Sequence, residues 1–205
     1  MKLQEADLRR RTMATIGLIR HGITDWNVQG KAQGLSDIPL NEEGRKQAER
    51  LANRLCDEEW DLIISSPLSR ARETARIIAS ATGVSLTITD DRIREIDCGL
   101  IEGMTEEERI HKWGENWREL DLGMEKFEDV AARGTHFLEE TYKRYYSQKL
   151  LVVCHAALIG LTLKRLMPHI FQTTYIENTS LTLLTKEQDE WVCKLYNCTD
   201  HLTSK

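Results

Sequence analysis

Three short apolar runs, each followed by polar residues, punctuate the chain. Continuous apolar runs of this length between turn residues are typical of strands that are buried on both faces of a sheet. The pattern predicts such strands at Thr15–Arg20, Leu62–Ser65 and Leu150–Cys154. A further strand is expected at Ser85–Thr89, and a C-terminal hairpin at Ser180–Thr185 and Trp191–Leu195.

Helical periodicity fills the segments between these strands. Asn41 is a good N-cap for a helix that runs to about Asp57, with Ala48, Leu51, Ala52 and Leu55 on one face. Ser66 and Pro67 suit the N-cap and first position of a second helix, which runs to about Thr82 and stops at Gly83. The remaining expected helices are a short one opened by a capping box at Thr105–Glu108 and carrying Trp113 and Trp117, Phe127–Tyr146, and Ala156–Met167.

Alternation of strands and helices predicts an α/β fold of three layers, α/β/α, around a mostly parallel mixed sheet with an antiparallel pair at one edge. Residues 14–205 are expected to form a single domain, and residues 1–13 an N-terminal extension. Residues from about 104 to 126 interrupt the alternation, so we interpret them as a small lid insertion.

The amino-acid composition argues against some classes of binding partner. The net charge of −5 argues against nucleic acid or an anionic membrane as the main partner. No apolar run approaches the roughly 20 residues of a membrane helix. Five cysteines, odd in number and without a CxxC pair, indicate reduced thiols and hence a cytoplasmic protein. We expect a monomer or a homodimer.

Polar side chains with unusual chemistry stand where two of the predicted strands end. Arg20 and His21 close the first strand, and His155 follows Leu150–Cys154. Arg70 falls in the first turn of the helix after Pro67. Taken singly, such residues are usually structural histidines or solvated arginines. Together, at the carboxyl ends of parallel strands, they form a pocket suited to a doubly charged anion such as a phosphoryl group.

Five blocks of sequence carry a family resemblance, and they occur in the family's order. They are LIRHGITDWN (Leu18–Asn27), Gln33-Gly34, SSPLSRARETA (Ser65–Ala75), REIDCGLIEG (Arg94–Gly103) and VVCHAALI (Val152–Ile159). The set resembles the signature of the histidine phosphatase superfamily, the phosphoglycerate mutase-like group. The resemblance implies the phosphoglycerate mutase-like fold and a phosphatase that acts on a small-molecule phosphate ester.

The resemblance also assigns roles to individual residues. It implies that His21 is the nucleophile that becomes phosphorylated and that Glu95 is the proton donor. Arg20, Arg70 and His155 would hold the phosphoryl oxygens. This set needs no metal ion, because the arginines supply the positive charge that a metal supplies in many phosphatases. The other histidines show no metal-ligand spacing, and no cofactor is expected.

Four further residues are expected to face the substrate. Asn27 would be a polar contact, and Gln33 and Gly34 lie in the family's substrate-facing loop. Ala156 stands where the family usually has Gly after the second histidine, and little effect is expected because both residues are small. Cys98 and Ile101 stand where related phosphatases often carry aromatic residues, and this departure leaves the identity of the substrate open.

Three alternatives to a general phosphatase remain. Cofactor-dependent phosphoglycerate mutases resemble the chain in its core but carry a longer insert and typically Arg and Tyr after the catalytic Glu. Here Ile96, Asp97 and Cys98 follow Glu95 and the lid is acidic, which favours hydrolysis over a mutase reaction. A specialised sugar-bisphosphate or ribazole-phosphate phosphatase is the second alternative. A non-catalytic phosphate-binding module is the third, and the presence of both histidines, both arginines and Glu95 argues against it.

Overall fold

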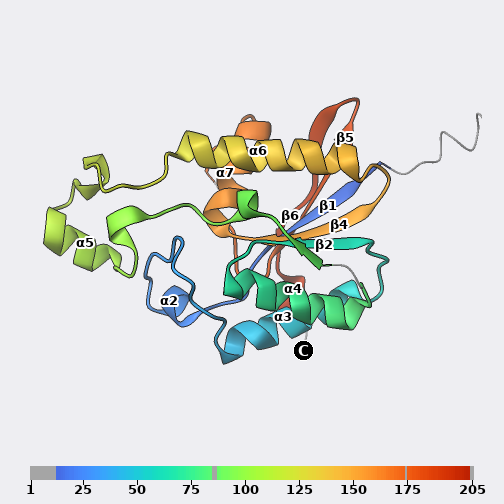
Figure 1. The fold of residues 1–205 in the computed structure, drawn as a ribbon, viewed down its shortest axis with the longest axis horizontal. Helices are drawn as coiled ribbons and strands as arrows, with labels where there is room; N and C mark the ends of the chain where they lie inside the picture. The colour runs from blue at the N-terminus through green and yellow to red at the C-terminus, as the bar shows by residue number, and fades with distance from the viewer. Residues whose placement is uncertain (1–12, 85–86, 174, 204–205) are drawn as a thin grey trace, which may run out of the picture.

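The computed structural model describes residues 13–84, 87–173 and 175–203, and its centre is a six-stranded mixed sheet (Figure 1). The strand order is β3-β2-β4-β1-β5-β6. β1, β4, β2 and β3 pair in parallel, β5 is antiparallel to β1, and β6 is antiparallel to β5. The strands span β1 Thr15–Arg20, β2 Leu62–Ser65, β3 Thr87–Thr89, β4 Lys149–Cys154, β5 Leu181–Glu187 and β6 Glu190–Cys198. The predicted α/β class with a mostly parallel mixed sheet is confirmed; of the strand expected at Ser85–Thr89, the first two residues lie outside the described ones.

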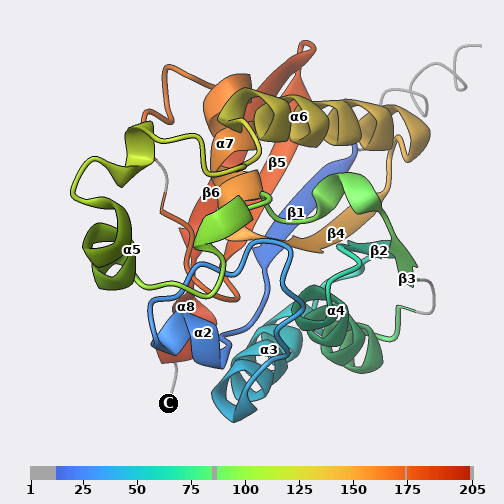
Figure 2. The same cartoon turned by 60° about the vertical axis from the view of Figure 1, so that its left-hand side comes forward.

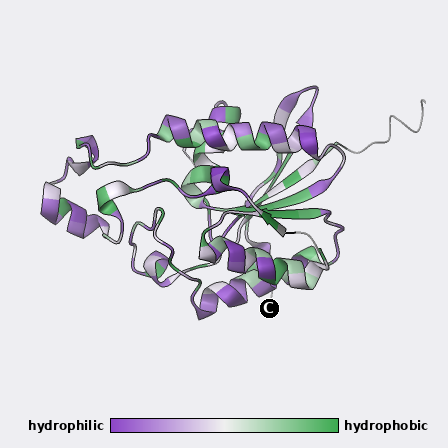
Figure 3. Cartoon of the chain, in the orientation of Figure 1, coloured by the Kyte–Doolittle hydropathy of each residue, from purple (hydrophilic) through white to green (hydrophobic). Residues whose placement is uncertain are grey.

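Two layers of helices cover the sheet because its strands are apolar on both faces. On one face Ile63, Leu151 and Val153 pack against α3 (Glu42–Leu55) and α4 (Ser69–Thr82). On the other face the alternate residues, among them Ile64, Leu150 and Val152, pack against α6 (Phe127–Arg144) and α7 (Ala156–Leu166). Figure 3 shows the central strands as the most hydrophobic part of the ribbon, between helices of mixed character.

Short elements complete the chain. The helices α2 and α8 and three 3-10 turns lie in connections that the apolar pattern did not identify as regular structure. They are α2 Asp25–Val28, η1 Asp91–Ile93, η2 Gly99–Ile101, η3 Trp117–Glu119 and α8 Asp200–Thr203, while α5 spans Glu106–Trp113.

Two details of the predicted helices are wrong. α4 begins at Ser69, with Leu68 in an extended conformation as its N-cap, and not at Pro67. Ser66 therefore does not cap the helix; its hydroxyl lies 2.7 Å from Nε2 of His155 instead. Trp117 lies outside the helix that carries Trp113, because α5 ends at Gly114, whose φ of 85° is incompatible with a further helical turn.

The predicted lid, residues 104–126, stands away from the sheet on the side where the parallel strands end (Figures 1 and 2). Its first residues are tied to the loop after α2, because Gly103 N donates to Ala32 O (2.8 Å) and Ala32 N donates to Met104 O (3.2 Å). Its last residues are tied back to the segment before it by the bond from Glu125 N to Asp97 O (2.9 Å). The insertion is therefore closed at its base by backbone hydrogen bonds, and its action as a lid stays a prediction.

A buried tryptophan holds the lid together. The Trp117 indole is 4% exposed and donates from Nε1 to Glu106 (3.0 Å). The guanidiniums of Arg109 and Arg118 lie 5.1 and 4.3 Å from its ring centroid, within the range of a cation–π contact. Across the described residues, no helix is both long and apolar enough to cross a membrane.

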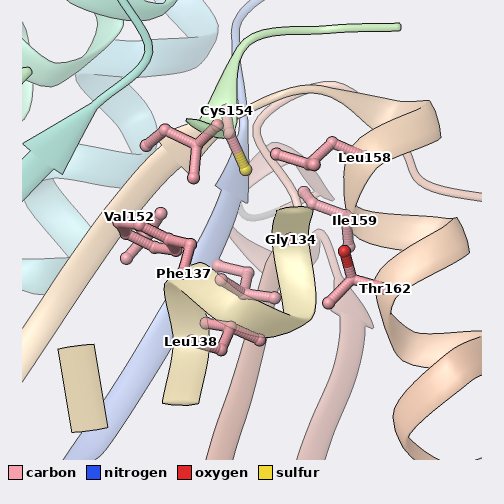
Figure 4. A pocket seen from close by; sticks show the side chains of 10 residues that line it. Gly134, Phe137, Leu138, Val152, Cys154, Leu158, Ile159 and Thr162 are labelled. Atoms are coloured by element: carbon pink, nitrogen blue, oxygen red, sulfur yellow. The ribbon is translucent and has the colours of Figure 1, made fainter. Parts of the chain in front are cut away.

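The contact between α6 and α7 is tight enough to be tested. Gly134 of α6 faces Thr162 of α7 beside a cavity of only about 10 Å³ (Figure 4). A Cβ at Gly134 would lie 2.0 Å from Thr162 Oγ1. The cavity has room for about one water-sized sphere, so it is too small to take up atoms displaced by the added methyl group.

Gly134→Ala should therefore lower the free energy of unfolding by about 1–3 kcal/mol, although Ala is the better helix former. Urea unfolding would measure this loss. In the double variant with Thr162→Ala the clashing oxygen is gone, so the combined loss should be smaller than the sum of the two single losses. Simple additivity would show that the two helices separate freely at this point.

Candidate active site

The two predicted histidines meet at the carboxyl edge of the sheet. His21 follows the last residue of β1, and His155 follows β4, the neighbouring parallel strand. Their ring centroids lie 5.2 Å apart with planes inclined at 58°. Their exposed fractions are 2% and 0%, so both rings are withdrawn from solvent. The strand register alone therefore brings together residues 134 positions apart in the chain.

The His21 ring has a defined tautomer. Its Nδ1 lies 2.7 Å from the carbonyl oxygen of Gly22, which can only accept a hydrogen bond. Nδ1 therefore carries the proton, and Nε2 keeps its lone pair. Burial lowers the pKa of His21 well below 6.5, and the charges of Arg20 and Arg70 lower it further. The ring is consequently a neutral imidazole with a nucleophilic nitrogen at neutral pH.

The His155 ring is oriented by Ser66. The Ser66 hydroxyl accepts a hydrogen bond from Leu68 N (3.3 Å) and lies 2.7 Å from His155 Nε2. This contact with Nε2 fixes the orientation of the His155 ring. Nδ1 is buried and has no partner among the described residues. Burial, followed by the charge of Arg70, also lowers the pKa of His155 well below 6.5.

Both arginines bind carbonyl oxygens. Arg20 Nη1 donates to Ile176 O at 2.7 Å. Arg70 is wholly buried and donates from Nη1 to Ser36 O (2.8 Å) and from Nη2 to Gly34 O (2.9 Å). The Nε of each guanidinium is buried without a partner in the described part of the chain. Burial lowers the pKa of both arginines, and the charge of Glu95 partly opposes this effect.

The carboxylate of Glu95 lies at the N-terminus of α7. Its Oε1 accepts hydrogen bonds from Leu158 N (3.2 Å) and Ile96 N (3.0 Å), and its Oε2 accepts one from Ala157 N (3.3 Å). The amide groups in the first turn of a helix are free to bind an acceptor, and the helix dipole favours negative charge there. The carboxyl is thus held at the same edge of the sheet as the two histidines.

The other predicted site residues occupy the loop after His21 and the start of α7. Asn27 Oδ1 accepts from Thr24 N (3.1 Å) in the capping box of α2, so its amide nitrogen is the end that could reach a ligand. Gln33 is 8% exposed, and its Oε1 accepts from Thr24 Oγ1 (3.0 Å). Ala156 is the first residue of α7, directly after His155.

Glu102 is a residue whose role sequence reasoning missed. Its Oε1 accepts from Leu35 N at 2.7 Å, and its Oε2 accepts from Ser36 N at 3.0 Å. The peptide group that donates Leu35 N–H is the one whose Gly34 carbonyl binds Arg70. Because C=O and N–H point in opposite directions from a trans peptide, this one group joins Glu102 on one side to Arg70 on the other.

Gly34 has the backbone conformation that this bridge requires. Its φ is +51°, in the left-handed region, and a Cβ there would stand 1.9 Å from Glu102 Oε1. The glycine is therefore explained by the approach of the carboxylate to the backbone. Ser36 repeats the arrangement, since its carbonyl binds Arg70 while its N–H and hydroxyl bind Glu102.

The bridge predicts that Glu102 affects anion binding without touching the anion. In Glu102→Gln the amide nitrogen cannot accept the loop's N–H groups, so the carbonyls that hold Arg70 should shift. Hydrogen bonds to a charged group are worth enough that vanadate inhibition should weaken by about one to two orders of magnitude.

A double-mutant cycle on the vanadate inhibition constant separates this effect from general destabilisation. In an Arg70→Ala background, Glu102→Gln should have little further effect. Glu107→Gln, an exposed residue of the adjacent α5, is the matched control and should leave inhibition unchanged. Full additivity of the Glu102 and Arg70 effects would contradict the bridge.

The two buried histidines also predict the pH dependence of stability. In the unfolded chain they bind protons near pH 6.5, whereas in the folded protein their pKa lies well below this value. Below pH 6.5 the unfolded state therefore binds more protons, and the free energy of unfolding should fall by up to about 1.4 kcal/mol per histidine for each pH unit.

Urea unfolding at about pH 7.5 and about pH 5.5 measures this slope. The double variant His21→Gln, His155→Gln should lose most of it. Burial also lowers the pKa of His201, to about 4, and this residue contributes to the slope in both proteins. An unchanged slope in the double variant would mean that neither buried ring carries the effect.

Comparison with known proteins gives the site a family context. The family described as "Histidine phosphatase superfamily (branch 1)" matches residues 16–199. The "Uncharacterized phosphatase PhoE" of Bacillus subtilis (strain 168) is 36% identical over 194 residues, covering 93% of this chain and 98% of the relative. "Phosphoserine phosphatase 1" of Hydrogenobacter thermophilus is 36% identical over 206 residues, covering 93% and 95%.

A solved structure agrees with this assignment. The mycobacterial glucosyl-3-phosphoglycerate phosphatase in complex with VO3 superposes with a TM-score of 0.80 at 29% identity, covering 90% of this chain and 99% of that one. The family match extends across nearly all of the sheet and includes both histidines, both arginines and the carboxyl described above. The chain therefore belongs to the histidine phosphatase superfamily.

Proposed function

We propose that this phosphatase of the histidine phosphatase superfamily hydrolyses small phosphate monoesters through a phosphohistidine at His21, without a metal ion. The observation that carries the proposal is the His21 ring itself. It is buried beside His155, its Nδ1 donates to Gly22 O, and its pKa is lowered. A neutral imidazole held in this way presents Nε2 for in-line attack on phosphorus.

In the first step, Nε2 of His21 bonds to phosphorus while the bond to the ester oxygen breaks. Negative charge on the equatorial oxygens would be stabilised by Arg20, Arg70 and Nδ1 of His155. The unpartnered Nε atoms of both arginines and the unpartnered Nδ1 support these roles, because buried polar atoms normally have a hydrogen-bond partner. A phosphoryl group would provide the missing acceptors.

Glu95 would donate a proton in the first step and accept one in the second. An alkoxide is a poor leaving group, so a carboxylic acid must protonate the ester oxygen as the bond breaks. In the second step, water attacks the phosphohistidine, and the carboxylate takes a proton from that water. The hydrogen bonds that the Glu95 carboxylate accepts from the first turn of α7, next to His155, support this assignment.

A mutase reaction is the main alternative. It would retain the phosphoryl group and return it to another oxygen of the same molecule, which requires additional basic groups around a bisphosphorylated intermediate. The acidic composition of residues 104–126 favours hydrolysis. Formation of 2-phosphoglycerate from 3-phosphoglycerate, at a rate above phosphate release, would favour the mutase.

Glu95→Gln tests the mechanism with two esters of different leaving groups. An alkyl phosphate leaves as a basic alkoxide, so its cleavage should slow by roughly 10²–10⁴-fold. A nitrophenyl phosphate leaves as a stable phenolate and should still phosphorylate His21 quickly. The variant should therefore release a burst of nitrophenol and then turn over slowly, because activation of water also needs the carboxylate.

The phosphorylated species identifies the nucleophile. Rapid quench of the Glu95→Gln variant should trap acid-labile, alkali-stable phosphate on the protein, and adding His21→Ala should abolish this label. Both measurements are to be repeated in EDTA and should not change. Equal slowing of the two esters without a burst, or label that survives His21→Ala, would disprove the mechanism.

A further inference from the structure

A cavity of about 320 Å³ opens beside Arg20. Its walls come from the end of β1, the first residue of α6, one side of α7 and the segment before β5. They consist of Arg20, Phe127, Ala156, Ala157, Leu161, Tyr175 and Ile176. None of these residues except Arg20 and Ala156 was predicted to take part in the site.

The cavity lies next to the groups that would bind the phosphoryl group and protonate the leaving group. Ala157, one of its lining residues, donates its backbone N–H to the carboxylate of Glu95. Arg20, on another wall, is a proposed ligand of the phosphoryl group. In the proposed mechanism the ester oxygen lies within reach of Glu95 and the phosphoryl group within reach of Arg20, which makes this neighbouring cavity the candidate site for the alcohol. The volume is near the lower end of the range of small-ligand pockets, about 300–1,000 Å³.

The walls of the cavity are uncharged apart from one group. Among the described lining residues Arg20 is the charged one, and its Nη1 already binds Ile176 O. The rim presents aromatic side chains, since Phe127 is 56% exposed and Tyr175 is 68% exposed. A bound apolar group would cover the exposed surface of both rings.

The nearby charges are acidic. The Tyr175 hydroxyl donates to Glu177 at 3.5 Å, so a carboxylate stands at the rim. Glu177 and Glu95 both act on Arg20, whose pKa they raise against the larger opposing effect of burial. A carboxylate on the leaving group would meet two like charges and no lining cation besides the one that serves the phosphoryl group. Burial of such an unpaired charge is costly.

Building on the proposed function, we infer that the substrates of this chain are phosphate monoesters of uncharged, largely apolar alcohols or phenols. The esters named for two of its relatives, phosphoserine and glucosyl-3-phosphoglycerate, both carry a carboxylate. This chain should discriminate against that group.

A series of n-alkyl phosphates from methyl to pentyl tests the inference. Transfer of one methylene into an apolar site should raise kcat/KM by roughly fourfold until the cavity is filled. Phosphoserine and 3-phosphoglycerate should be cleaved at least about tenfold less efficiently than butyl phosphate, a difference that corresponds to the loss of about one favourable contact.

Phe127→Ser should reduce the gain per methylene. The ring is exposed, so the substitution should not threaten folding. Ile170→Ser, at another exposed apolar residue that does not line the cavity, is the matched control and should leave the series unchanged.

The possible results distinguish a failure of this inference from a failure of the proposed function. A flat alkyl series, or preference for the carboxylate-bearing esters while labelled His21 still forms, would overturn this inference and leave the phosphohistidine mechanism standing. Absence of label with every ester would overturn the proposed function and the inference together.

Discussion

The arrangement of the site depends on two guanidiniums, buried Arg70 and half-buried Arg20, that are held by carbonyl oxygens and not by carboxylates. Arg70 is wholly buried, and its Nη1 and Nη2 bind Ser36 O and Gly34 O, while Arg20 binds Ile176 O. A carbonyl positions a guanidinium without cancelling its charge, so the pocket keeps a positive potential in a poorly solvated place. Such a place favours a dianion strongly and disfavours a protonated imidazole. Burial, and after it the same potential, lowers the pKa of His21 and His155 and keeps both rings neutral.

The fold supports this potential from a distance. Glu102 is one of the carboxylates whose charge acts on Arg70, after Glu95 and Asp37, and a peptide group separates its side chain from the guanidinium, so it orients the loop without touching Arg70. Ser66 acts similarly on His155, since its hydroxyl fixes the ring through Nε2 and leaves the buried Nδ1 without a partner among the described residues. In both cases a residue outside the pocket fixes the geometry of a group inside it, as precise positioning of a reacting site requires.

The apolar pattern was sufficient to locate the sheet, its two helical layers and the strand ends that carry Arg20, His21 and His155. Apolar burial on both faces dictates those elements, and parallel strands share one carboxyl edge. The start of α4 was wrong because Ser66 was expected to cap the helix, while its hydroxyl is engaged by a ring 89 residues away. Glu102 was missed for a related reason: its partners Leu35 and Ser36 are 67 and 66 residues away, beyond any local pattern. The walls of the cavity beside Arg20 come from four separate segments, and no local pattern assembles them.

The closed base of residues 104–126 has a consequence for how this protein can change over evolution. Backbone bonds join Gly103 to Ala32 at one end and Glu125 to Asp97 at the other, and the side chains of Trp117 and Leu122 pack in the hydrophobic core. The exposed side chains between these anchors can vary, and exposed residues can be added or removed, at a small cost in loop-closure entropy and without disturbing the anchors. The exposed part of the insertion can therefore diverge while its anchors stay in place. The insertion combines a variable surface with a fixed base.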